Sequence, residues 1–286
     1  MSMKIVADSS ADLFKLDDVD FASVAMRVVT DERDFSDNEN LDILEMMEYM
    51  GKYTGKSGSA CPGVGDYLLA FGEAEEIFCV TITSGLSGSF NAARAAAMQY
   101  EEANPGRRVL VIDTKSTGPE SALIILKIQE MIQSGLSFEV ISYEIERYCR
   151  RTHLIFCLQS LHNLAANGRA NPVVAKLAGF LGIRVIGQAS IAGELETLCK
   201  SRGGERAIAD IIKHMKENGY RGGAVRIHHA ENPRAALVLK KRLLAEFEGA
   251  QITVSRTHGL CSFYAERGGL LVGFEGARKK QEKTNK

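Results

Sequence analysis

The sequence predicts an α/β protein of two domains, in which a parallel-sheet α/β/α domain precedes a mixed α+β domain. The first half alternates apolar strand segments with helical segments, an order typical of a parallel sheet covered by helices on both faces. The second half departs from this alternation and contains a predicted hairpin tip at residues 191–196, which indicates some antiparallel pairing. The length of 286 residues is sufficient for two domains of ordinary size.

The N-terminal domain is expected to cover residues 1–151. Its strands are predicted where apolar residues dominate a short segment, because a strand covered on both faces needs no polar side. These segments are residues 4–7, 21–30, 76–82 and 108–113. Its helices are predicted where apolar residues recur at helical spacing. These segments are residues 42–53, 66–73, 90–102, 121–134 and 138–151. The acidic segment 31–40 and the Gly/Ser-rich segment 55–65 are predicted to be loops.

The C-terminal domain is expected to cover residues 152–277, and a basic flexible tail is expected at residues 278–286. Its predicted strands are residues 154–158, 183–186, 223–228, 252–254 and 269–274. Its predicted helices are residues 173–181, 206–218 and 233–248. This order of elements indicates a mixed sheet with helices.

Composition narrows the class of protein. The net charge of -1 gives no electrostatic reason to expect a nucleic-acid partner, because backbone binding needs a concentrated basic face. No apolar run is long enough for an integral membrane span, and the first residues lack the apolar core of a signal peptide. The six cysteines form no C-x-x-C pair and the six histidines show no ligand spacing, so no disulfide, metal or cofactor is expected. We therefore expect a cytoplasmic protein.

A polar turn at residues 83–89 follows the predicted buried strand at residues 76–82. In open α/β sheets, ligands bind beyond the carboxyl ends of the strands. The following helix offers unpaired N–H groups and a positive dipole end to an anion. Glycines that allow close backbone approach and serines that supply hydroxyl groups make up most of the turn: Gly85, Gly88, Ser84, Ser87 and Ser89. We therefore predict that the turn binds a small anionic head group.

Two other functions remain open at this point. A serine nucleophile elbow reads G-x-S-x-G, whereas residues 85–89 read G-L-S-G-S and end in serine. A nucleophile at Ser87 would also need a base held by a third group. The histidines that could supply it are His153, His162, His228, His229 and His258. A serine-dependent ester hydrolase and a binder of a small anionic metabolite therefore remain as alternatives.

Several segments resemble, in order, motifs of the DegV family of bacterial fatty-acid-binding proteins. Residues 7–13 (A-D-S-S-A-D-L) resemble its D-S-[ST]-x-D-L opening, and residues 84–93 (S-G-L-S-G-S-F-N-A-A) resemble its S-x-L-S-G-T-Y segment. Residues 59–67 resemble its T-S-x-P-S loop, and residues 228–232 resemble its H-x-x-N-like segment. Residues 167–169 resemble its G-G-R-I stretch, and residues 181–186 resemble its L-x-I-K-P-I stretch. The ordered set covers nearly the whole chain.

The resemblance implies a carrier that holds one long-chain fatty acid, such as palmitate, between its two domains. Some members similar to this chain present the bound acid to a separate fatty acid kinase subunit, so no catalytic residue is expected here. By position, Ser59, Ser87 and the backbone of Gly88 match the groups that bind the carboxylate. Residues expected near this site are Arg169, Ser84 and Tyr264.

The C-terminal end departs from the family's pattern. Many members carry T-H-x-G-P-G there, with the histidine near the head group; in this chain that position falls at Tyr264, and residues 266–268 (E-R-G) replace G-P-G. The preceding His258 need not substitute for it. We therefore expect the head-group contacts, or the contact with a kinase, to differ here. The acyl tail is expected in an apolar tunnel, with candidate lining residues Leu177, Phe180 and Leu181.

Overall fold

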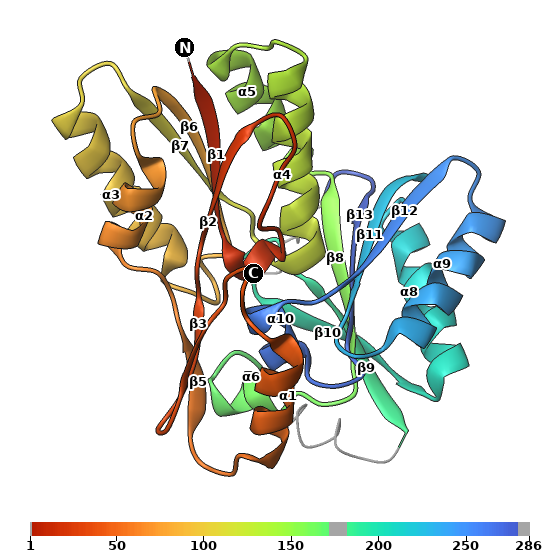
Figure 1. The fold of residues 1–286 in the computed structure, drawn as a ribbon. Coiled ribbons are helices and arrows are strands. Elements are labelled where there is room, and N and C mark those ends of the chain that lie inside the picture. The colour runs from red at the N-terminus through yellow and green to blue at the C-terminus, as the bar shows by residue number, and fades with distance from the viewer. Residues whose placement is uncertain (1, 172–181, 280–286) are drawn as a thin grey trace, which may run out of the picture.

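The structure, a computed structural model, describes residues 2–171 and 182–279 (Figure 1). Its N-terminal part contains a four-stranded parallel sheet in the order β2-β1-β6-β7. The strands are β1 (Met3–Asp8), β2 (Asp20–Val24), β6 (Glu76–Thr81) and β7 (Arg108–Asp113). One face carries α2 (Val64–Phe71) and α3 (Ser89–Ala103), and the other carries α4 (Gly118–Gln133) and α5 (Phe138–Cys149) (Figure 1). The predicted parallel-sheet α/β/α architecture is confirmed.

The central strands of this sheet are apolar throughout because each of their faces packs against helices. Ile5 and Ala7 of β1 pack in the core formed with α4 and α5. Val6, which lies between them, packs instead in the core formed with α2 and α3. Successive side chains of a strand point to opposite faces, so two covered faces require a continuous apolar run.

A three-stranded antiparallel sheet in the order β4-β3-β5 extends from the parallel sheet (Figure 1). It consists of β3 (Arg27–Thr30), β4 (Asp34–Ser36) and β5 (Ser57–Ala60), and α1 (Ile43–Lys52) packs beside it. Three predictions are wrong here. The strand predicted at residues 21–30 is divided between β2 and β3, and the predicted loops 31–40 and 55–65 contain β4 and β5. Pairing with β3 makes these polar segments strands, and composition does not reveal such a partner.

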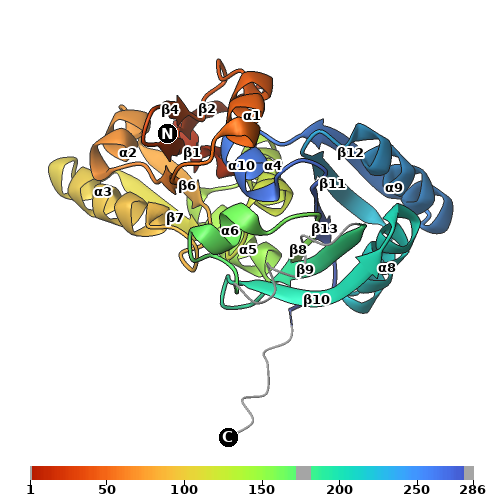
Figure 2. The same cartoon turned by 90° about the horizontal axis from the view of Figure 1, so that it is seen from below.

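The C-terminal part contains a six-stranded mixed sheet in the order β10-β9-β8-β13-β11-β12, as predicted for an α+β domain. Its strands are β8 (Thr152–Leu158), β9 (Ile183–Ala189), β10 (Leu195–Arg202), β11 (Gly223–His229), β12 (Ala250–Arg256) and β13 (Leu270–Glu275). One face is covered by α8 (Gly204–Glu217) and α9 (Pro233–Glu246) (Figure 2). On the other face, α4 contacts β8, β11 and β13, so a helix of the parallel-sheet part also packs against this sheet.

In the described C-terminal part, the structure adds three elements that were not predicted, and it changes one expectation about the end of the chain. The additions are β10, α6 (His162–Ala166) and α10 (Gly259–Ala265). The predicted helix at residues 173–181, with the tunnel candidates Leu177, Phe180 and Leu181, lies outside the described residues. The basic tail was expected to begin at residue 278, but the Lys279 side chain is only 12% exposed and its Nζ lies 2.8 Å from Oε1 of buried Glu120. The packed chain therefore extends to Lys279.

Candidate functional site

A cavity of about 630 Å³, a volume that includes its open mouth, lies between the small sheet, the turn after β6 and the six-stranded sheet. Most of the side chains around it are apolar. The walls come from segments far apart in the chain, with β8, β10, β13 and α10 on the C-terminal side. The apolar lining residues are Met26, Ile82, Leu86, Leu154, Phe156, Leu158, Leu164, Leu195, Leu260, Cys261, Ala265 and Leu271.

The β8 strand supplies a wall of the cavity through alternate side chains. Leu154, Phe156 and Leu158 line the cavity. Ile155 and Cys157 point to the other face of the sheet, where they pack in the core with α8 and α9. The continuous apolar sequence of β8 therefore serves two cores at once, which is why it did not reveal which side chains face a ligand.

Gly187 of β9 makes room for Phe156 in this wall. A Cβ atom on Gly187 would lie 2.2 Å from Phe156 Cζ and 2.3 Å from the backbone oxygen of Glu196. Gly187→Ala is therefore expected to displace Phe156 and the β10 backbone, lowering the free energy of unfolding by about 2 kcal/mol. Urea unfolding measures the change. Gly51→Ala in α1, where a Cβ meets nothing within 4 Å, is the matched control and should cause no loss; equal losses in both would contradict this account.

The polar end of the cavity brings together four residues that were predicted for the site. Ser59, Ser87, Arg169 and Tyr264 all line the cavity. Ser59 Oγ and the Tyr264 hydroxyl are hydrogen-bonded at 2.7 Å, although 205 residues separate them in the chain. The Arg169 guanidinium lies over the Tyr264 ring, 5.4 Å from its centroid. Two hydroxyl groups, a phenol and a cation thus converge at one end of an apolar space.

Arg169 is directed to the cavity by the end of α6. Gly168 has a φ of 70°, and the N–H groups of Gly168 and Arg169 donate to the carbonyls of Ala165 and Leu164, which is the Schellman pattern of a helix end. The Arg169 Nε then donates to the Leu86 carbonyl at 3.1 Å. This explains the N-G-R sequence: glycine allows the left-handed turn, and the arginine that follows reaches the turn after β6.

Three residues of the turn after β6, Ser84, Ser87 and Gly88, differ in their surroundings. The Ser87 hydroxyl accepts a hydrogen bond from the Ser89 N–H at 3.2 Å at the start of α3. Gly88 is exposed and is not a lining residue, although it follows Ser87 directly. Ser84 is also not a lining residue; its hydroxyl accepts from Lys115 Nζ at 3.0 Å, beside an Asp113–Lys115 ion pair. The expectation that Ser84 lies near the site stays a prediction: its hydroxyl contacts charged neighbours, and it lies three residues before the lining residue Ser87.

Tyr264 is a neutral hydrogen-bond donor at neutral pH. Burial raises the pKa of its phenol, and the contacts with Ser59 and Arg169 oppose this rise only in part. The phenol therefore keeps its proton and can donate it to Ser59 or to an anion. Tyr264 occupies the position at which the resemblance led us to expect a histidine. His258 itself is not a lining residue and contacts Asp37 instead.

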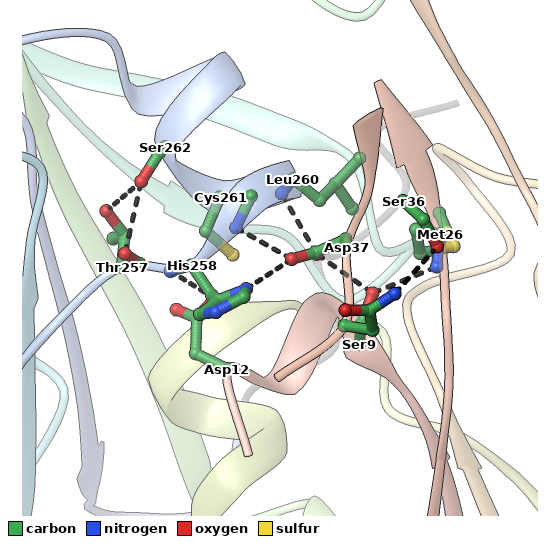
Figure 3. A network of polar contacts seen from close by, with 12 residues as sticks. Ser9, Asp12, Met26, Ser36, Asp37, Thr257, His258, Leu260, Cys261 and Ser262 are labelled. Carbon is green, nitrogen blue, oxygen red and sulfur yellow. Dashed lines mark hydrogen bonds and ion pairs between the residues drawn. The ribbon is translucent and has the colours of Figure 1, made fainter. Parts of the chain in front are cut away.

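A buried network fixes α10, the helix that carries Tyr264 (Figure 3). Asp37, which follows β4, is fully buried and accepts hydrogen bonds from the backbone N–H groups of Gly259 and Leu260 at 2.7 and 3.0 Å. It also accepts from the His258 ring at 2.5 Å and from the Ser9 hydroxyl at 2.9 Å. A carboxylate from the N-terminal part thus caps a helix of the C-terminal part, where the first N–H groups have no partner of their own.

The cavity can hold an elongated amphipathic molecule with an anionic head group. A buried carboxylate requires hydrogen-bond donors and a counter-charge, and the polar end provides both. Among the described residues that line the cavity none is a histidine, so Ser87 has no imidazole base there. No group of three His, Cys, Asp or Glu side chains within residues 2–171 and 182–279 is arranged to hold a metal ion. The described helices also include none that is both long and apolar enough to cross a bilayer.

The fold and this cavity define a two-part α/β binding protein for an amphipathic ligand. A family model described as uncharacterised proteins of the DegV family matches residues 2–275. A DegV domain-containing protein of Streptococcus pyogenes serotype M1 is 39% identical over 279 residues, which cover 96% of this chain and all of the relative. The chain belongs to the DegV family.

Two solved structures have nearly the same fold. A DegV family protein from Eubacterium eligens, loaded with heptadecanoic acid, has a TM-score of 0.95 and 42% identity, covering 96% of this chain and 100% of that one. The Streptococcus pneumoniae Fatty Acid Kinase (Fak) B3 protein, loaded with linoleic acid, has a TM-score of 0.95 and 40% identity, covering 97% and 100%.

Proposed function

We propose that this protein binds one long-chain fatty acid, such as palmitate, in the cavity between the small antiparallel sheet and the six-stranded sheet. The carboxylate lies among Ser59, Ser87, Arg169 and Tyr264, with the backbone N–H of Gly88, an exposed residue, at the edge of this group. The acyl tail lies along the wall formed by β8, β13 and α10. The observation that carries the proposal is a cavity with one polar, positively charged end and an apolar body.

The energetics favour a lipid over a small anionic metabolite. Burial of each methylene gains about 0.8 kcal/mol, so a dozen methylenes offer roughly 10 kcal/mol before other costs. Association and ordering of the chain consume several kcal/mol of this. The tail thus supplies most of the affinity and the polar end supplies orientation. A short polar metabolite would leave most of the apolar lining without a partner.

We further infer that the protein is a carrier, which presents the carboxylate to a fatty acid kinase subunit. The relative from Streptococcus pneumoniae is named as part of a fatty acid kinase, and it is 40% identical to this chain. Gly85 and Gly88, on either side of Ser87, are exposed, so the head-group end is close to the protein surface. All six cysteines are free thiols, which supports a location in the reducing cytoplasm.

Ser87→Ala is expected to weaken fatty-acid binding by at least about tenfold, because a hydrogen bond to a charged group contributes roughly 1.5–3 kcal/mol. Titration calorimetry with a single fatty acid measures this. Ser84→Ala removes a hydroxyl from the same turn but outside the cavity, and should leave the affinity unchanged. A fatty alcohol of the same chain length should bind poorly to the wild type. Equal affinities for acid and alcohol would show that the carboxylate is not the recognised group.

A further inference from the structure

A second cluster of reactive side chains lies outside the fatty-acid cavity, on β10 and α8. These two elements contact each other in the C-terminal part (Figure 2). Cys199 Sγ lies 3.6 Å from His214 Nε2. His214 Nδ1 lies 2.7 Å from Glu217 Oε2 on the same helix. A carboxylate beside Nδ1 keeps the proton on that nitrogen, so the lone pair of Nε2 faces the thiol. Thiol, imidazole and carboxylate therefore form a hydrogen-bonded series of the kind that activates nucleophiles.

A bulge in β10 directs Cys199 to this place. Leu195 lines the fatty-acid cavity, and in a regular strand Cys199, four positions later, would point to the same face. The pairing with β9 shifts by one residue between Thr197 and Cys199. The shift turns Cys199 to the opposite face, where it packs against the α8 core. Bulges often redirect a side chain beside functional sites.

We propose that Cys199 is a modification site whose thiol is oxidised by hydroperoxides. His214 deprotonates this thiol when the hydroperoxide reaches the sulfur. The sulfur attacks one peroxide oxygen, so an S–O bond forms while the O–O bond breaks. His214 takes the thiol proton and passes it to the leaving oxygen, which departs as water or an alcohol. The sulfur is oxidised to a sulfenic acid by two electrons, and the peroxide is reduced by two.

The groups around Cys199 favour a thiol that is deprotonated by a base during the attack, rather than a permanent thiolate. Burial, followed by the Asp210 carboxylate, raises the pKa of the Cys199 thiol, and the Ser201 hydroxyl and nearby cations oppose this rise. The thiol is therefore protonated at rest and needs the imidazole during attack. The neighbouring titratable and charged groups, from α8, β8 and β9, are Arg206, Asp210, Lys213, Glu217, Cys157 and Arg184.

The test treats the full-length protein in two ways: with iodoacetamide, and with hydrogen peroxide followed by dimedone, which traps sulfenic acid. Peptide mass spectrometry follows the reaction at each cysteine. His214→Gln should slow both reactions at Cys199 by about tenfold, since a positioned base contributes this much or more. Glu217→Gln should slow them by less. Cys61, which is also half-buried and has no described histidine contact, is the internal control and should be unaffected. An unchanged Cys199 rate in His214→Gln would overturn the proposal.

The wild type alone provides an independent readout if a variant loses its fold. With an imidazole as base, the alkylation rate at Cys199 should depend less steeply on pH than that of an unassisted thiol, whose reactivity follows its own deprotonation. A rise as steep as that of a free cysteine would contradict base assistance. Alkylation without a dimedone adduct after peroxide treatment would overturn hydroperoxides as the class.

Discussion

Arg169→Met is expected to weaken fatty-acid binding by at least about a hundredfold. Removing one partner of a buried ion pair costs roughly 3–5 kcal/mol, because the remaining charge stays desolvated, and each 1.4 kcal/mol corresponds to about tenfold in affinity. Arg169 is the only cation among the described residues that line the cavity. Methionine keeps an apolar stem of similar length, so the change chiefly removes the charge and its hydrogen bonds.

Two comparisons separate the charge from the packing of Arg169. Arg169→Lys keeps the positive charge but loses the planar group that contacts Leu86 and stacks on Tyr264, so an intermediate loss is expected. A fatty alcohol carries no charge, and its weak binding should change little in Arg169→Met. Calorimetric titration of the acid and the alcohol into the wild type and both variants measures these effects. A parallel loss for acid and alcohol would mean that Arg169 only shapes the cavity.

Asp37→Ala is expected to lower the free energy of unfolding by about 3–5 kcal/mol, the range for leaving several buried polar partners unsatisfied. The change leaves two N–H groups at the start of α10 unpaired, together with the His258 ring and the Ser9 hydroxyl. Because α10 carries Tyr264, fatty-acid affinity should fall as well. Urea unfolding followed by circular dichroism measures the stability.

Asp42→Ala is the matched control for this prediction. Asp42 also caps a helix, accepting from the N–H groups of Leu44 and Glu45 at the start of α1, but it is exposed and caps only its own segment. Its loss should cost about 1 kcal/mol and leave fatty-acid binding unchanged. If the two substitutions have equal effects on stability and binding, Asp37 does not position α10.

The parts of the fold that sequence predicts well are those with strong local patterns. The strands β1, β6 and β8 read as apolar runs because both faces are covered, and the turn after β6 stands out through its glycines and serines. The helix α3 follows it at helical spacing. For these elements, the local pattern and the tertiary environment agree.

The site depends on elements that lack such patterns. The strand β5 carries Ser59 but has the sequence S-G-S-A, and it is a strand only because it pairs with β3. The helix α10 carries Tyr264 and spans seven residues, and its cap, Asp37, comes from a distant part of the chain. Ser59 and Arg169 were found through family resemblance, whereas Cys261 and the β8 wall were missed because apolar lining looks like ordinary core.

The most direct test of the fatty-acid proposal is the lipid content of the protein itself. The chain is expressed in a bacterial host, denatured and extracted, and the extract is quantified by mass spectrometry alongside that of Arg169→Met prepared in the same way. We predict close to one long-chain fatty acid per wild-type chain and a marked deficit in the variant. A wild-type protein that carries no fatty acid, and takes up none when palmitate is added back, would contradict the account.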